Sequence, residues 1–223
     1  PEDDDPSDDS EQRKFGAYLS EESHLRRARK AILPLVDDDA LLKNGQLPPQ
    51  SLEASIMDLA DDIAYSIHDL EDFCSQGFID LSAAVDSLGQ YIANPNDPKN
   101  TFAVSAQKMA KFNPEQFDFA EHVKAAGRIQ VLLDNINPPE WSQSARDQQL
   151  RGDLSAKIGE FFSSICIAGE SEAPTVSLAS PQWHDMQVMK RVTKQFLVGT
   201  SRMAQIQHAQ RQTIERLFIG LEQ

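Results

Sequence analysis

The chain has 223 residues, enough for one large domain or for one domain with an appended lobe. Its formal net charge of −14 is concentrated at the start, where seven acidic residues and no basic ones lie within the first eleven positions. The remainder is mildly acidic, which argues against a general nucleic-acid surface, because phosphate backbones are bound chiefly by clustered Lys and Arg.

The apolar residues recur at spacings of three and four, and alternating β-branched stretches are rare, so the sequence predicts a mainly α fold. No run of eighteen apolar residues and no signal segment occurs, so we expect no membrane partner and a cytoplasmic location. Cys74 and Cys166 each lie in a helical pattern, which indicates buried thiols rather than a disulfide or zinc site. A start at Pro1 without Met suggests a fragment or processed segment.

In chain order, residues 1–12 form an acidic segment expected to be a loop or disordered. We expect a helical domain over residues 13–170 and a C-terminal helical lobe over residues 171–223. The first helix is predicted to be capped by Ser20 and to end near Pro34. Its basic run faces solvent, or neutralises an acidic neighbour or a phosphate; it consists of Arg26, Arg27, Arg29 and Lys30.

A central helix is predicted to start after its N-cap Ser51 and to reach about Cys74, before Gly77. Further helices are expected over about 81–93 and 101–111, from Asn113-Pro114 onward, over about 144–167, from Ser180-Pro181 onward and over about 203–221. Residues 174–178 are the one plausible strand. Residues 181–223 are locally basic, so this end is expected to dock against an acidic face or to bind an anion.

The central helix has two contrasting faces. Its apolar stripe, expected to face the core, consists of Leu52, Ile56, Leu59, Ile63, Ile67 and Leu70. At about 100° per residue, the opposite side carries Asp58, Asp61, Tyr65, His68 and Asp72, with Asp62 and Asp69 on its flank.

This acidic side has two readings that the sequence leaves open. It is either a solvated surface or a functional face. No Lys or Arg lies between Asp58 and Asp72, and like charges one turn apart are destabilising, so the acids need a metal ion or basic side chains from elsewhere. His68 either faces a substrate or pairs with Asp72 or Asp61. The other histidines are expected to be ordinary packing or surface residues; they are His24, His122, His184 and His208.

The stretch SLEASIMDLADDIAYSIHDLED, residues 51–72, resembles the signature helix of the deoxyguanosinetriphosphate triphosphohydrolase-like family of HD-domain phosphohydrolases. Residues 14–18 and 211–218 resemble other parts of that family. The resemblance implies that this chain is the C-terminal portion of such a protein, built as a remnant of a helical HD-type bundle with a C-terminal lobe. It also implies a homo-oligomer that hydrolyses deoxynucleoside triphosphates to the deoxynucleoside and tripolyphosphate with Mg²⁺ or Mn²⁺.

The resemblance assigns roles by position. It makes Asp61 a metal ligand, places Tyr65 against the sugar and phosphates of the substrate, and lets Asp69 contact the 3′-hydroxyl, with His68 as a further candidate for substrate contact. The implied reaction is metal-assisted attack of water at the α-phosphorus. No catalytic residue within this chain is assigned.

The family's other metal ligands, a His and a His-Asp pair, lie upstream of this helix, whereas only His24 precedes it here. We therefore expect this chain to carry the later part of an active site and to be inactive by itself. The alternative is a non-catalytic helical module, either a degenerate relative of the family or an interaction and assembly domain whose acidic face pairs with basic segments such as residues 26–30 or 190–194.

Overall fold

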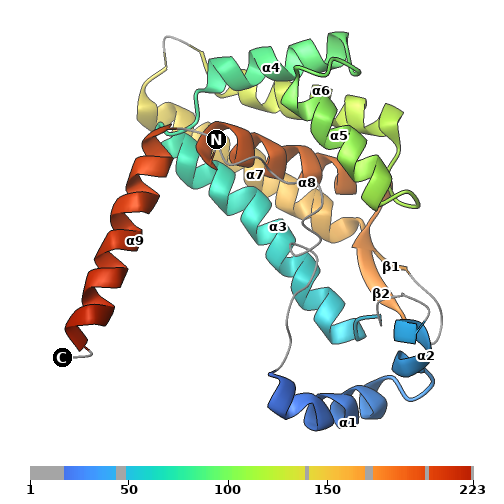
Figure 1. Cartoon of the computed structure of the whole chain (residues 1–223). Helices are drawn as coiled ribbons and strands as arrows, with labels where there is room; N and C mark the ends of the chain where they lie inside the picture. The colour runs from blue at the N-terminus through green and yellow to red at the C-terminus, as the bar shows by residue number, and fades with distance from the viewer. Residues whose placement is uncertain (1–17, 44–48, 139–140, 169–172, 199–200, 222–223) are drawn as a thin grey trace. The chain divides into compact units, whose positions relative to one another are not determined.

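The structure is a computed structural model that describes residues 18–43, 49–138, 141–168, 173–198 and 201–221 (Figure 1). Within these ranges the chain is almost wholly helical, with one two-stranded sheet, so the predicted mainly α fold is confirmed. The predicted acidic loop at residues 1–12 lies outside the described residues. The chain divides into two compact units, one of residues 1–55 with 168–175 and one of residues 56–167 with 176–223. The HD-type bundle and the domain boundary expected at residue 170 stay predictions.

The first unit contains a 3-10 turn, η2 (Leu19–Glu21), and the helices α1 (Glu22–Ile32) and α2 (Asp38–Lys43). The prediction that Ser20 caps α1 is wrong, because Ser20 lies inside η2 and the helix begins two residues later, after Glu21. The guanidinium of Arg29 donates to both carboxylate oxygens of Asp38, at 2.6 and 2.9 Å. That part of the basic run therefore neutralises an acidic neighbour.

The remaining elements belong to the second unit, apart from the first turn of α3 and the outer ends of the strands. They are α3 (Leu52–Ser75), α4 (Leu81–Ala93), α5 (Thr101–Phe112), α6 (Phe119–Asn135), α7 (Gln143–Ser163), β1 (Ile165–Ala168), β2 (Thr175–Leu178), α8 (Ser180–Thr193), the π-helical segment η3 (Lys194–Val198) and α9 (Ser201–Leu221).

Short polar side chains start most of these helices by accepting a hydrogen bond from the first turn. Asp80, Asn100, Asp118 and Ser142 do so for α4, α5, α6 and α7. The prediction that a helix starts at Asn113-Pro114 is wrong. The carbonyl of Asn113 instead accepts the backbone N–H groups of Gln116 and Phe117, which makes a turn, and α6 begins only after Asp118.

The helix predicted to run to residue 167 ends at Ser163, and the apolar residues that follow form β1. β1 pairs with β2, which confirms the strand predicted near residues 174–178. Both cysteines are free thiols. Cys74 is buried as predicted, whereas Cys166 is exposed on β1, so its predicted burial in a helix is wrong.

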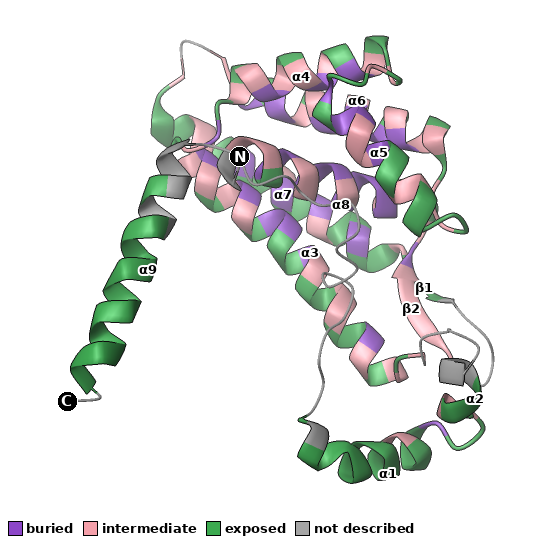
Figure 2. Ribbon diagram, in the orientation of Figure 1, coloured by how far each residue is buried: buried purple, intermediate pink, exposed green. Residues whose placement is uncertain are grey.

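The core of the second unit lies where α4 packs on α6 and α6 packs on α8. Figure 2 shows the buried positions gathered on the facing sides of these helices. Leu88, Ile129 and Val188 are completely buried, one from each helix. Burying a side chain of this size stabilises the fold by about 1.5–3 kcal/mol. No helix in the described part of the chain is long and apolar enough to cross a membrane.

Candidate functional site

α3 forms where the sequence predicts it, and its start is fixed by Ser51. The Ser51 hydroxyl accepts the backbone N–H of Ala54 at 3.2 Å, which is the bond expected of an N-cap. Gly77, with a φ of +66°, follows the end of the helix and provides the left-handed conformation that glycine favours. The 24 residues of α3 therefore present the predicted faces in one continuous helix.

The apolar stripe of α3 is buried over only part of its length. Ile63, Ile67 and Leu70 are buried and belong to the main core, as predicted. Ile56, two turns earlier than Ile63, is 50% exposed, so its predicted core position is wrong for the described part of the chain. The stripe is therefore open at Ile56, whereas Leu59 packs partly buried against the core.

The candidate site residues lie on the solvent side of this helix. Asp61 and His68 are exposed, Tyr65 is 57% exposed, and Asp69 is half-buried. Asp61, Tyr65 and Asp69 are four residues apart, so each lies one helical turn beyond the last with a drift of about 40° per step. One face of α3 thus carries two carboxylates and a phenol within two turns.

Two acids of α3 have cationic partners from other helices. Lys190 of α8 lies 2.8 Å from an Asp62 oxygen, and Arg151 of α7 lies 3.0 Å from a Glu71 oxygen. These two acids are therefore neutralised by basic side chains from other helices. This is one of the two possibilities that the sequence leaves open. Asp61 has no ion pair among the described residues.

The pKa of Asp69 is raised above its ordinary value. Partial burial is the main cause, and the negative charge of Asp72 adds to it, while His68 acts in the opposite direction. The described residues include no hydrogen bond from His68 to Asp61 or to Asp72. A carboxyl group can hydrogen-bond a hydroxyl in either protonation state, as an acceptor when ionised and also as a donor when protonated.

An apolar groove of about 450 Å³ runs along the flank of α3 next to this face. We call it the α3 groove; its wall on α3 includes Ile56, Ala60 and Ala64, and α7 contributes Ile158 and Phe162. His68 is the one ionisable residue among those that line it. The groove is therefore suited to apolar contacts and lies beside the acidic face rather than within it.

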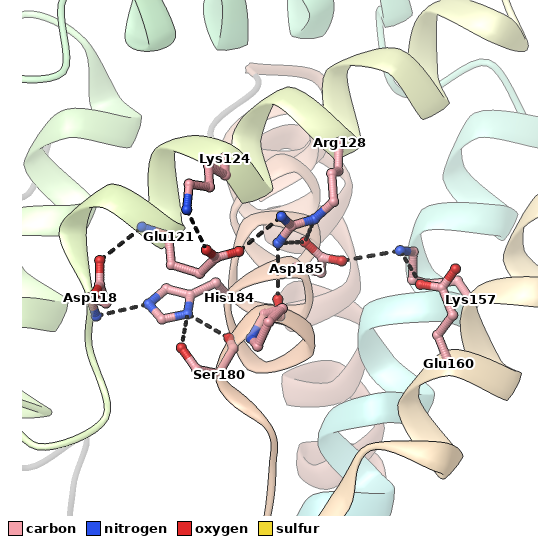
Figure 3. Close-up of polar contacts among 10 residues, drawn as sticks. Asp118, Glu121, Lys124, Arg128, Lys157, Glu160, Ser180, His184 and Asp185 are labelled. Carbon is pink, nitrogen blue, oxygen red and sulfur yellow. Dashed lines mark hydrogen bonds and ion pairs between the residues drawn. The ribbon is translucent and has the colours of Figure 1, made fainter.

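An ionic cluster centred on a buried aspartate joins α6, α7 and α8 (Figure 3). The Asp185 side chain, 2% exposed, accepts hydrogen bonds from Arg128 at 2.8 Å and from Lys157 at 3.1 Å. Glu121 pairs with the same Arg128, and Glu160 with the same Lys157. The sequence places Asp185 in the first turn of a helix but carries no signal for its two cationic partners, because they come from other helices.

Two histidines next to this cluster are packing residues, as predicted. His184 Nε2 accepts the backbone N–H of Asp118 at 3.0 Å, so its Nδ1 carries the proton and donates to the Ser180 carbonyl at 2.6 Å. His122 is buried against the ring of His184, and burial lowers the pKa of His122 to about 3, with a smaller contribution from His184. Both rings help to hold α6 against α8.

Among the described residues, no group of three or more His, Cys, Asp and Glu side chains could hold a metal ion. A divalent cation such as Mg²⁺ or Mn²⁺ takes about six oxygen ligands from protein, substrate and water. Asp61 alone does not make such a site, and its assignment as a metal ligand stays a prediction.

Comparison with known proteins confirms the resemblance seen in the sequence. No family model matches the chain. A deoxyguanosinetriphosphate triphosphohydrolase-like protein of Aliivibrio fischeri ES114 is 24% identical over 77% of this chain and 34% of its own length. Proteins of the same name from Streptomyces coelicolor and Shewanella pealeana are 34% and 42% identical over 53% and 27% of this chain, and over 24% and 14% of their own lengths. The chain spans about a third of the Aliivibrio fischeri relative's length.

Proposed function

Because this chain is related to the deoxyguanosinetriphosphate triphosphohydrolase-like family, we propose that the protein containing it hydrolyses deoxynucleoside triphosphates such as dGTP. The products are the deoxynucleoside and inorganic tripolyphosphate. This chain contributes the α3 face to the active site, and the native protein is a homo-oligomer.

The arrangement on α3 is the observation that carries the proposal. Asp61, Tyr65 and Asp69 are accessible, follow one another at one-turn intervals and have no ionic partner from another helix among the described residues. A purely structural acidic face is expected to be neutralised by neighbouring cations, as Glu71 is by Arg151. The three residues are instead open to a ligand.

Each residue has a role in the proposal that suits its chemistry. The Asp61 carboxylate is a hard oxygen ligand for Mg²⁺ or Mn²⁺. The half-exposed ring of Tyr65 offers an apolar surface for the deoxyribose and a hydroxyl for the phosphates. The carboxyl group of Asp69 hydrogen-bonds the 3′-hydroxyl, and His68 is a further contact at the edge of the face.

The metal would act as a Lewis acid toward a phosphoryl oxygen when bound. It needs ligands in addition to those of the described residues. What the described residues themselves do is orient the nucleoside, because contacts on two successive helical turns fix both its position and its direction.

The test is release of tripolyphosphate from dGTP by the native protein that contains this chain, in the presence of Mn²⁺. Asp61→Ala is expected to abolish the release. Asp86→Ala is the matched control, because Asp86 is an exposed aspartate on α4, outside the proposed site. Turnover that survives Asp61→Ala unchanged would contradict the proposal.

A second candidate function is a non-catalytic interaction or assembly module, and the α3 groove is the observation that favours it. Ile56, Phe162 and Ile165 line the groove and are 50%, 66% and 41% exposed. Large exposed apolar patches mark contact surfaces. Absence of dGTP turnover in a folded native protein, together with self-association that Phe162→Glu disrupts, would support this function instead.

A further inference from the structure

The Lys190 side chain reaches the edge of the candidate site from a different helix. α8 is anchored by the buried residues Met186, Met189 and Val192, and Lys190, on its half-exposed side, extends to α3. Its Nζ atom lies 2.8 Å from Oδ1 of Asp62, with the two side chains 36% and 44% exposed. Asp62 lies about 100° around α3 from Asp61, on the same flank of the helix as Asp69, so the ammonium lies at the edge of the candidate face.

The ammonium has hydrogen-bonding capacity left over. A lysine side chain carries three N–H donors. In the described part of the chain, Asp62 is the one acceptor for Lys190. Since both side chains are partly exposed, the remaining donors are accessible to a ligand on the α3 face.

An anionic substrate needs such a cation at this place. The α3 face carries several carboxylates, and a triphosphate of about four negative charges is repelled by them unless cations intervene. Lys190 forms the one ion pair to the stretch Asp61–Asp69 among the described residues. Lysine is suited to phosphate because its ammonium is a compact charge that can follow any of several oxygens.

We propose that Lys190 is a substrate-binding residue that contacts the triphosphate, with Asp62 holding its ammonium in place between turnovers. The proposal rests on the proposed function and identifies the phosphate contact of the same site. A different reading is that the pair only ties α8 to α3. Partly exposed ion pairs contribute little to stability, so a pair that only linked the two helices would stabilise the fold little.

The two readings differ in what happens when Asp62 is changed. If Lys190 binds phosphate, Asp62→Asn releases the ammonium and leaves phosphate binding as tight or tighter. If the pair is only a tie between helices, Asp62→Asn and Lys190→Met remove the same interaction and have the same effect.

The experiment measures binding of inorganic tripolyphosphate, with Mn²⁺ present, to the native protein containing this chain by calorimetry. We expect Lys190→Met to weaken binding about tenfold, the loss typical of one charge-assisted contact. Lys190→Arg retains most of the affinity, because it keeps the charge. Arg151→Met, which breaks the ion pair with Glu71 near the C-terminal end of α3, is the matched control and leaves binding unchanged.

The inference is overturned if Lys190→Met binds tripolyphosphate like the wild type, if Asp62→Asn weakens binding as much as Lys190→Met, or if the wild type does not bind it. Thermal unfolding of each variant establishes that the compared proteins are folded. Binding needs no turnover, so the two proposals fail separately. If the protein turns over dGTP but Lys190→Met does not change tripolyphosphate affinity, only the role of Lys190 is overturned. If tripolyphosphate binding depends on Lys190 but dGTP is not turned over, only the proposed function is overturned.

Discussion

Lys157 of α7 donates a hydrogen bond of 3.1 Å to the carboxylate of Asp185 of α8, and both side chains are almost fully enclosed, at 10% and 2% exposure. The other Asp185 oxygen accepts a hydrogen bond from the guanidinium of Arg128 of α6. One buried carboxylate thus holds a cation from each of two further helices. α8 also carries Lys190, so this cluster fixes the helix that reaches the candidate site.

Replacing Asp185 by Ala is expected to destabilise the fold by about 3–5 kcal/mol, because it removes the buried carboxylate that Lys157 and Arg128 share and leaves each cation with one glutamate partner. The measurement is the free energy of unfolding in urea. Glu215→Ala removes an acid from an ion pair on exposed α9 and is the control, with an expected change within about 0.5 kcal/mol. A loss of less than about 1 kcal/mol for Asp185→Ala would show that the cluster does not hold the helices together.

His122 is expected to make the fold sensitive to acid. Burial lowers its pKa in the folded chain to about 3, while an unfolded histidine has a pKa of about 6.5. Between these values the unfolded state binds the additional proton, so the free energy of unfolding falls as the pH falls from about 6.5 toward 3. From pH 7 to pH 5 this one residue accounts for a loss of about 2 kcal/mol.

His122→Phe tests this dependence, because Phe keeps an aromatic ring against Tyr91 and cannot titrate. We expect urea unfolding of the variant to lose about 2 kcal/mol less than the wild type between pH 7 and pH 5. His24→Phe, on the exposed surface of α1, is the control and retains the wild-type dependence. Equal pH dependence of His122→Phe and wild type would contradict the assignment.

The elements that the sequence predicts correctly are those with local start signals. Ser51 caps α3, and Pro181 lies in the first turn of α8, where its missing N–H has no cost. The errors come from signals with two meanings. Asn113-Pro114 is a turn here although the same pair can start a helix, and Ile165 lies in a short apolar run that fits either a helix or a strand.

In the candidate site, too, the positions set by local helical periodicity are predicted, whereas the contacts that depend on helix packing are not. Helical periodicity alone places Asp61, Tyr65 and Asp69 on one solvent-facing side of α3, as the structure has them. The sequence offers the basic segment 190–194 as a possible partner of the acidic face, and Lys190 does pair with Asp62. It does not predict which acid is bound, because the two residues are 128 positions apart and meet only when α8 packs. Periodicity also overstates burial at Ile56, since it reports the apolar side of a helix and not what covers that side.

The stripe of α3 offers a matched pair of substitutions for the α3 groove. Ile67→Ala, at a position with 1% exposure, is expected to cost about 2–5 kcal/mol of stability because it leaves a cavity in the core. Ile56→Ala, at 50% exposure in the groove, is expected to cost less than about 1 kcal/mol. Both are measured by urea unfolding of this chain. Equal losses would mean that Ile56 is covered, for example in an oligomer.

Titration of this chain with Mn²⁺ tests how complete its metal site is. The described residues offer no group of three potential ligands, and one carboxylate holds a divalent ion poorly because most of the coordination shell stays water. We therefore expect calorimetry to detect binding no tighter than about millimolar, the range of weak calcium modules. Asp61→Asn is the paired variant, and it should remove whatever weak binding arises at α3. Micromolar binding that Asp61→Asn abolishes would mean that this chain supplies further ligands of its own. Micromolar binding indifferent to Asp61→Asn would place the ion elsewhere, and Asp61 would lose its assigned role.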